Sequence, residues 1–213
     1  MRTQVLVLAK TPVPGRVKTR LCPPCSPEQA AAVAAAALAD TLDAVTATRT
    51  AARTLVVDGD HAAPPGWARM TQRGGPLGER LANAYADTRT AGLASVLIGM
   101  DTPQVSPMLL EAAGRGLDRA DAVLGAAEDG GWWVLGLRDA RYAEVLRDVP
   151  MSTSTTGSAT LAALRARGLR VGNLAVLQDV DTADAARTVA ARCAAGSRFA
   201  RAVAAHVPSQ VPA

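Results

Sequence analysis

Four basic side chains gather in one short loop that follows the first predicted strand. Only two of the 23 basic residues are lysines, Lys10 and Lys18, and both lie in this loop with Arg16 and Arg20. A basic loop at the carboxyl end of a strand is suited to binding a polyphosphate, with backbone N–H groups as further donors. The alternative is a solvated basic loop. We predict nucleotide contacts here, and a catalytic role for Lys18; the predicted contact residues are Ala9, Lys10, Gly15, Arg16, Lys18 and Arg20.

Carboxylates follow two further predicted strands. Asp101 stands in Gly99–Pro103 (GMDTP), and Asp179 and Asp181 follow the last predicted strand. Oxygen ligands that face a phosphate-binding loop suit Mg²⁺ or Mn²⁺. We therefore predict that Asp101, Asp179 and Asp181 bind a metal ion and that Asp101 is also catalytic. The alternatives are an Asx-turn at Asp101 and a helix N-cap at Asp181-Thr182.

Two loops are candidates for binding an acceptor. The first, Glu128–Trp133 (EDGGWW), holds Asp129, which could orient an acceptor or act as a base. Its two glycines let the backbone approach a ligand closely, although a tight turn between two strands has the same composition. The second loop, Met151–Thr156, is rich in hydroxyls that could bind phosphate or cap a helix. We predict that Asp129 is catalytic and that Gly130, Gly131, Ser152 and Thr153 contact the acceptor.

A glycine-rich segment and a cysteine pair complete the list of candidate motifs. Gln72–Arg80 contains three glycines before a predicted helix, and Gly75 and Leu77 are expected to contact the nucleotide. Cys22 and Cys25 have C-x-x-C spacing, but the chain offers no second close pair for a structural zinc site. We interpret them as thiols in a proline-rich loop.

Apolar runs alternate with helical patterns along the chain, which predicts an α/β fold. We expect a three-layer sandwich with a mostly parallel, Rossmann-like sheet. Residues 1–206 are expected to form one domain and residues 207–213 a frayed tail. The predicted strands are 4–9, 55–58, 95–99, 121–124, 132–137 and about 169–177. The predicted helices are 26–45, 76–88, one from 106, 140–148, about 158–167 and 182–195.

Composition narrows the range of partners. Aromatic residues are 3% of the 213, too few for a platform on which single-stranded nucleic acid stacks. No uninterrupted apolar run approaches membrane-spanning length, and no signal-peptide pattern begins the chain. Three cysteines cannot all pair, which fits a reducing cytoplasm. We expect a cytoplasmic protein that binds a nucleotide and a small-molecule acceptor, without nucleic acid or a membrane span.

Four segments together resemble a known family. AKTPVPGRVKTRL, GMDTP, AAEDGGWWVLGL and LQDVDT occur here in the order and spacing found in the domain of unknown function 2064 family. That family is also described as radical-SAM/selenodomain-associated transferase 1, within the GT-A or nucleotide-diphospho-sugar transferase superfamily. The resemblance extends from about Val5 to about Asp184.

The wider superfamily implies roles for some of these residues. The basic loop and the Asp-x-Pro turn resemble the molybdenum-cofactor and 2-phospholactate guanylyltransferases, in which carboxylates matching Asp101 and the D-x-D-T segment bind the metal. Gly75–Gly78 (GPLG) is similar to the turn that approaches the base in the molybdenum-cofactor relatives. Two departures are visible: Pro103 replaces the second aspartate of the glycosyltransferase D-x-D, and the G-x-G-x-R signature of nucleotidyltransferases is absent.

These features predict a metal-dependent, nucleotide-using transferase. Nucleotidyl transfer from an NTP to a small phosphorylated acceptor, with release of pyrophosphate, fits four cations in one loop, because charge develops on the leaving group. The alternative is a GT-A glycosyltransferase that moves a sugar from an NDP-sugar. A third interpretation is a non-catalytic, nucleotide-binding subunit.

Overall fold

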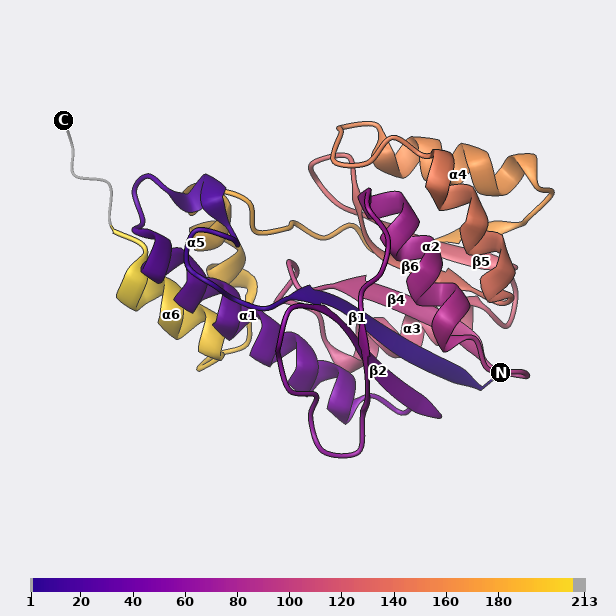
Figure 1. Cartoon of the computed structure of the whole chain (residues 1–213), viewed down its shortest axis with the longest axis horizontal. Coiled ribbons are helices and arrows are strands. Elements are labelled where there is room, and N and C mark those ends of the chain that lie inside the picture. Colours follow the sequence, from indigo (N-terminus) through magenta and orange to yellow (C-terminus); the bar gives the residue numbers. More distant parts are fainter. Residues whose placement is uncertain (1, 209–213) are drawn as a thin grey trace.

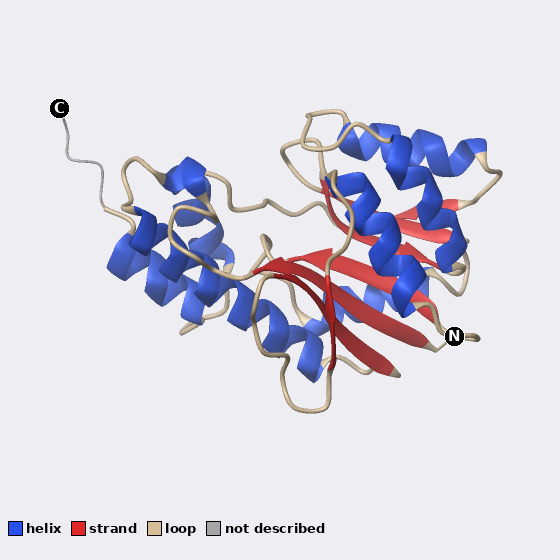
Figure 2. Ribbon diagram, viewed as in Figure 1, coloured by secondary structure: helices blue, strands red, loops and turns tan. Residues whose placement is uncertain are grey.

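The computed structural model describes residues 2–208 and contains a seven-stranded sheet (Figures 1 and 2). The strand order is β3-β2-β1-β4-β6-β5-β7. Only β6 runs antiparallel to its neighbours, β4 and β5, so the predicted α/β fold with a mostly parallel sheet is confirmed. The strands are β1 (Thr3–Lys10), β2 (Ala52–Asp58), β3 (Ala68–Thr71), β4 (Ala94–Gly99), β5 (Ala122–Ala126), β6 (Trp132–Leu137) and β7 (Val171–Asn173).

Helices cover both faces of this sheet because its central strands are apolar on both sides. On one face, Val5 and Val7 of β1 pack in a cluster with α1 and α3; on the other, Leu6 packs with α2, α4 and the 3₁₀ segment η2. The three layers thus follow from the alternation of side chains along each strand. The helical elements are η1 (Thr19–Leu21), α1 (Pro27–Ala47), α2 (Leu77–Thr88), α3 (Pro107–Gly116), η2 (Ala140–Asp148), α4 (Thr156–Ala166), α5 (Ala183–Arg192) and α6 (Arg198–His206).

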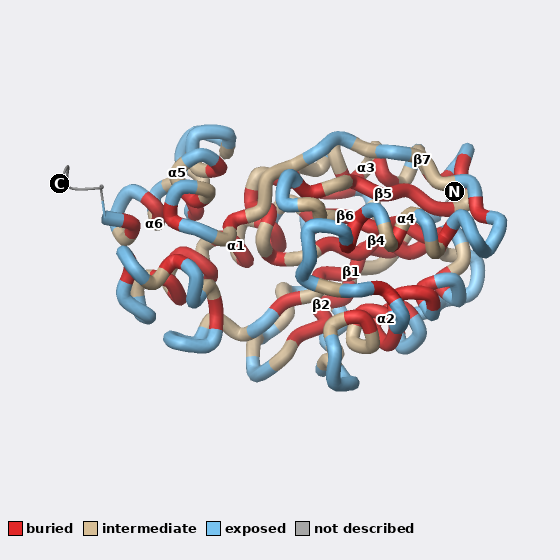
Figure 3. The backbone as a smooth tube through the Cα atoms, turned by 90° about the horizontal axis from the view of Figure 1, so that it is seen from above, coloured by how far each residue is buried: buried red, intermediate tan, exposed pale blue. Residues whose placement is uncertain are grey.

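A third apolar cluster lies beyond the sheet, in a helical lobe formed by η1, the first half of α1, α5 and α6 (Figures 1 and 3). Leu21 and Phe199 are fully buried in it. Val207, the first residue of the predicted tail, is buried in this cluster; residues 209–213 lie outside the described part of the chain. The lobe adjoins the end of the sheet at which β1 leads into the basic loop.

Helix α1 joins the lobe to the sheet. It begins at a capping box, in which Ser26 and Gln29 satisfy each other's backbone N–H groups. By length and composition alone, this helix could cross a membrane. Its polar residues interrupt the apolar stretch, so the sequence contains no uninterrupted apolar run of that length. However, 56% of its apolar window is buried inside the protein, as in a core helix. Its buried side chains contribute to both the sheet cluster and the lobe cluster.

Candidate functional site

The basic loop and the GMDTP loop leave the same edge of the sheet. β1 is parallel to both β2 and β4, so Lys10 ends β1 opposite Asp58 of β2, and Gly99 ends β4 two residues earlier, opposite Leu8. Hydrogen bonds hold these ends together: Thr11 N–H donates to the Asp58 carbonyl (2.9 Å) and Lys10 N–H to Met100 Sδ (3.3 Å). Ligands of open α/β sheets bind beyond this carboxyl edge.

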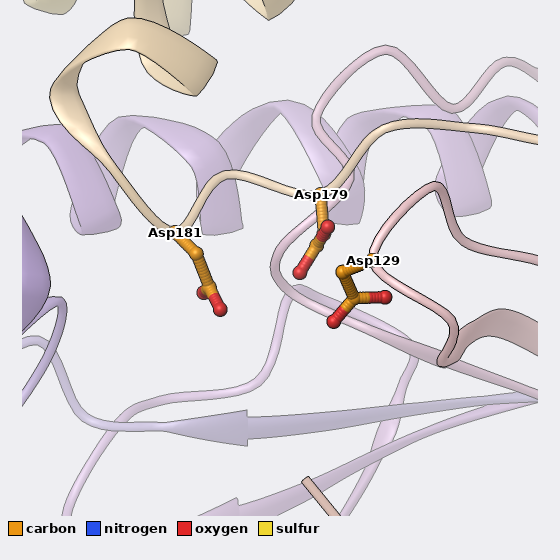
Figure 4. A group of neighbouring side chains, drawn as sticks. All are labelled: Asp129, Asp179 and Asp181. Atoms are coloured by element: carbon orange, nitrogen blue, oxygen red, sulfur yellow. The ribbon is translucent and has the colours of Figure 1, made fainter. Parts of the chain in front are cut away.

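Three carboxylates meet beside these loops (Figure 4). Asp129 comes from the β5–β6 loop, and Asp179 and Asp181 come from the segment that connects β7 to α5. One oxygen from each lies within 4.8 Å of the others. We call these three residues the carboxylate trio.

Backbone pairing fixes the trio. Glu128 N–H donates to the Leu177 carbonyl (2.9 Å), which joins the β5–β6 loop to the β7–α5 segment. Val180 N–H donates to the Asp101 carbonyl (2.9 Å), which joins that segment to the loop after β4. Gln104 Nε2 donates to the Gln178 carbonyl in a second bond between the same loops.

Lys18 connects Asp101 to the trio. Its ammonium lies 2.5 Å from Asp101 Oδ1 and 3.4 Å from Asp181 Oδ1, and its side chain is only 8% exposed. Arg20 contacts the other oxygen of Asp181 at 3.0 Å, but its side chain is 72% exposed. Burial by itself lowers the pKa of Lys18, but the charges of Asp101 and Asp181 outweigh it and raise the pKa above its ordinary value. Lys18 is therefore a cation in the site.

The trio carries more negative charge than its surroundings balance. Burial, followed by repulsion from Asp129 and Asp181, raises the pKa of Asp179 to about 6. Crowded hard oxygen ligands of this kind fit Mg²⁺ or Mn²⁺. Asp179 and Asp181, two of the three predicted ligands, belong to the trio. The third member is Asp129, whereas Asp101 pairs with Lys18.

Asp179→Asn is expected to stabilise the metal-free protein above pH 6. The folded-state pKa of Asp179, about 6, exceeds the unfolded value of about 4. The folded state therefore binds the proton more tightly, and stability falls as the pH rises through this window. Because the carboxyl is half-buried, we expect a gain on the order of 1 kcal/mol at pH 7.5 and almost none near pH 4.

Urea unfolding in the presence of a chelator, at both pH values, measures this effect. Asp148→Asn is the matched control, since Asp148 is an exposed residue at the end of η2. An Asp179→Asn variant that is less stable than the wild type at pH 7.5 would contradict the prediction.

A hollow of about 360 Å³ adjoins the basic loop. Lys10 and Arg16 line it together with Asp58. Thr11 also lines it, and its Oγ1 is buried without a hydrogen-bond partner among the described residues. Gly15 adopts a positive φ of +74° with open space around it. Two of the predicted phosphate-binding residues, Lys10 and Arg16, thus line this hollow.

A larger hollow of about 650 Å³ lies between α1, the loop after β4 and the α5–α6 turn. Its wall includes Asp40 and Arg198, which are paired with each other. The Asp40 carboxylate also accepts from the backbone N–H groups that begin α6. These charges are already paired, so this hollow adds no residue to the candidate site.

Gly75 and Leu77, which are predicted nucleotide contacts, both have partners within the protein. Gly75 N–H donates to Glu79 Oε2 (2.9 Å), and Leu77 packs against the apolar cluster below α2. Gln72, which the sequence analysis did not list as a contact, donates from Nε2 to the Ala9 carbonyl (2.6 Å) and accepts from Arg80. Gln72 thus positions the end of β1, where the basic loop starts.

The two predicted acceptor loops lie against each other. Gly157 N–H donates to the Gly130 carbonyl (2.8 Å), and an ideal Cβ on Gly130 would lie 2.0 Å from the Ser154 carbonyl oxygen. Gly131 N–H donates to Asp129 Oδ1 (2.8 Å) and so orients that carboxylate. Ser152 and Thr153 are exposed to solvent.

The cysteines and tryptophans have structural positions. Cys22, Cys25 and Cys193 are free thiols, and Cys25 donates to the His206 carbonyl within the helical lobe. Trp133 is buried, with its Nε1–H bonded to the Ala175 carbonyl, and Trp132 donates to Thr160 Oγ1. The β5–β6 turn is therefore a tight turn that precedes two packed tryptophans, and it also positions Asp129.

Solved structures with this fold include nucleotide-using enzymes. A "putative nucleotide-diphospho-sugar transferase" from Desulfovibrio desulfuricans is 24% identical, with a TM-score of 0.82 over 96% of this chain and 98% of that one. A CMP:2-keto-3-deoxy-manno-octonic acid synthetase complexed with CTP is 10% identical, with a TM-score of 0.57 over 89% and 97% of the two chains. Rv0371c from Mycobacterium tuberculosis, in complex with manganese, is 19% identical, with a TM-score of 0.54 over 89% and 98%. These likenesses show that the chain shares the fold of these three proteins.

A comparison with curated proteins finds no match. A family model described as "Uncharacterized protein conserved in bacteria (DUF2064)" matches residues 30–153. The matched stretch is more than half of the chain and contains the GMDTP and EDGGWW motifs, whereas the basic loop and the D-x-D-T segment lie outside it. The chain therefore belongs to the domain of unknown function 2064 family.

Proposed function

We propose that the protein transfers a nucleotidyl group from an NTP to a small phosphorylated acceptor and releases pyrophosphate. The observation that carries this proposal is the position of Lys18, which brings the basic loop into contact with the carboxylates at one edge of the sheet. A triphosphate that loses pyrophosphate requires both kinds of group, because charge builds up on the leaving oxygens.

Separate groups of residues would bind the triphosphate and the metal ion. Lys10 and Arg16 line the hollow beside β1 and would bind the triphosphate with Lys18 and Arg20. Asp129, Asp179 and Asp181 would hold Mg²⁺ or Mn²⁺, with Asp101 adjacent through Lys18. When bound, the metal ion would neutralise charge on the phosphates. The neighbouring fold complexed with CTP and the one complexed with manganese support this ligand set.

The chemical step requires little proton transfer. A phosphate oxygen of the acceptor attacks the α-phosphorus of the NTP and forms a new P–O bond. The bond between the α-phosphorus and the bridging oxygen breaks, and pyrophosphate leaves with that electron pair. An ionised phosphate is already a nucleophile, so Asp129 is not needed as a base; its place in the trio favours metal binding instead.

The acceptor would lie beside the Gly130–Gly131 turn. The exposed hydroxyl-rich loop at Ser152 and Thr153 lies next to this turn and offers hydrogen-bond donors. Donors of this kind can bind a phosphate without adding positive charge. This arrangement supports a phosphorylated acceptor of modest size.

Glycosyl transfer from an NDP-sugar is the second candidate. It is supported by the name given to the Desulfovibrio desulfuricans protein, whose fold this chain shares along nearly its whole length. In this reaction the leaving group is a nucleoside diphosphate, which carries fewer phosphates for the basic loop to neutralise.

One pair of assays separates the candidates. The protein is incubated with Mg²⁺ or Mn²⁺, each NTP and a pool of phosphorylated metabolites, and pyrophosphate is measured. In parallel, NDP-sugars are supplied and free NDP is measured. We expect pyrophosphate only when acceptor is present. Release of NDP without pyrophosphate would instead establish the second candidate, and nucleotide binding without either product would indicate a non-catalytic subunit.

A further inference from the structure

Lys18 occupies an unusual position for a side chain that is also expected to bind phosphate. Its ammonium is nearly enclosed by protein and contacts Asp101 and Asp181. Asp181 belongs to the carboxylate trio, so Lys18 lies where it competes with a metal ion for the same negative charge.

We propose that Lys18 is a displaceable counter-ion of the carboxylate site, and that it must leave Asp181 before a divalent cation binds tightly. This inference rests on the metal site of the proposed function. It adds that the free protein holds an internal cation in place of the metal and therefore binds free metal weakly.

The electrostatics support an exchange of cations. The site contains four carboxylates, of Asp101, Asp129, Asp179 and Asp181, and within residues 2–208 two cations are bonded to them, Lys18 and Arg20. A divalent ion at the trio would lie close to the buried ammonium, and the two charges would repel strongly because little water screens them. Arg20 is mostly exposed, so its charge is screened much more.

The hollow beside β1 would offer the Lys18 ammonium a second place once phosphates are bound there. Lys18 lies at the end of the same basic loop whose Lys10 and Arg16 line the hollow beside β1. An ammonium on a flexible four-carbon stem can turn from a carboxylate to a phosphate without a large backbone change. Phosphates in that hollow would therefore attract Lys18 away from Asp181 and open the trio.

This arrangement couples the two ligands. A nucleotide that draws Lys18 away raises the affinity of the trio for metal, and by thermodynamic linkage the metal raises the affinity for the nucleotide by the same factor. The protein would then bind a metal–nucleotide complex in preference to either component alone.

Mn²⁺ binding to the nucleotide-free protein, measured by calorimetry, tests the inference. Lys18→Met removes the internal cation and is expected to tighten Mn²⁺ binding about tenfold or more. Lys18→Arg keeps the charge and should bind Mn²⁺ much as the wild type does. Arg49→Met is the matched control, because Arg49 is an exposed cation in the α1–β2 connection, outside the site.

Thermal unfolding in the presence of a chelator provides a second measurement. Lys18→Met leaves the carboxylates of Asp101 and Asp181 without their ammonium, so its melting temperature should fall below that of Arg49→Met and recover when Mn²⁺ is added. Lys18→Gln, which keeps a donor, replaces the methionine variant in both measurements if the latter does not fold.

The outcomes are distinct. Wild-type protein that binds Mn²⁺, with an affinity that Lys18→Met leaves unchanged or weakens, would overturn the counter-ion role and leave the metal site intact. If neither protein binds Mn²⁺, the metal site of the proposed function fails and the inference fails with it.

Discussion

Asp181→Asn is expected to slow pyrophosphate release by roughly 100-fold to 1,000-fold, the range found when one charge-stabilising group is removed from an active site. Asp181 belongs to the carboxylate trio and is also the residue that pairs with both Lys18 and Arg20. Asparagine keeps the shape of the side chain but loses the negative charge that would hold a metal ion. The rate should be measured at saturating NTP and Mn²⁺, so that weaker binding does not account for the loss.

Asp148→Asn again serves as the control, because it removes one carboxylate outside the site. Its activity should equal that of the wild type. Circular dichroism of Asp181→Asn must show the wild-type fold before its rate is interpreted. A loss of less than about tenfold in a folded Asp181→Asn variant would remove Asp181 from the catalytic site.

The loops that carry Lys18 and Asp101 are placed side by side by a rule that needs only the sequence. β1 and β4 are buried apolar runs, and parallel strands end at the same edge of a sheet. Loops that follow them are therefore neighbours, although the two residues lie far apart along the chain. The side-chain contact itself is not visible in the sequence, because it depends on the path of the loop from Thr11 to Lys18.

The same rule also applies to the loop that carries Asp129. β5 is parallel to β4, since both pair with the antiparallel strand β6. The loop after β5 therefore emerges at the same edge, and Asp129 was a candidate ligand by the reasoning used for Asp101. Its position near Asp179 also requires the bridge between Ala127 and Leu177, a long-range pairing that has no local signal.

The elements that sequence reasoning missed are of two kinds. α6 had a detectable pattern: Ser197 at the N-cap, then Phe199, Val203 and Val207 at helical spacing. β3 had none, because this edge strand is mostly exposed and has no alternating apolar residues. Because β3 is not predicted, the position of Gln72, which follows β3 at the carboxyl edge of the sheet, is not predicted either.

Two predicted elements have a different form in the structure. The segment at Ala140–Asp148 is a 3₁₀ helix rather than an α-helix, and the strand predicted over about 169–177 is reduced to β7 at 171–173. The first of these packs closely on α2: an ideal Cβ on Gly78 would lie 2.2 Å from the carbonyl oxygen of Leu146 in η2. The backbones of α2 and η2 touch at this point, and no periodic pattern in either segment shows such a contact.

Gly130→Ala is expected to lower the free energy of unfolding by roughly 2–4 kcal/mol, the sum of backbone strain and a steric clash. Gly130 has a positive φ of +91°, and its added Cβ would meet the backbone of Ser154. The clash cannot be relieved by turning a side chain, because every close atom there belongs to the Ser154 backbone. The β5–β6 turn and the loop at Ser154 would have to separate and lose the hydrogen bond from Gly157 to Gly130.

Gly168→Ala separates the two contributions. Gly168 also has a positive φ, +77°, but an added Cβ would meet no atom within 4 Å. This control therefore carries the backbone strain alone, about 1 kcal/mol. Denaturant unfolding of both variants should show that Gly130→Ala loses at least 1 kcal/mol more than Gly168→Ala. Equal losses would mean that the loop at Ser154 moves aside freely. The close approach of Gly130 to the Ser154 backbone would then contribute no stability.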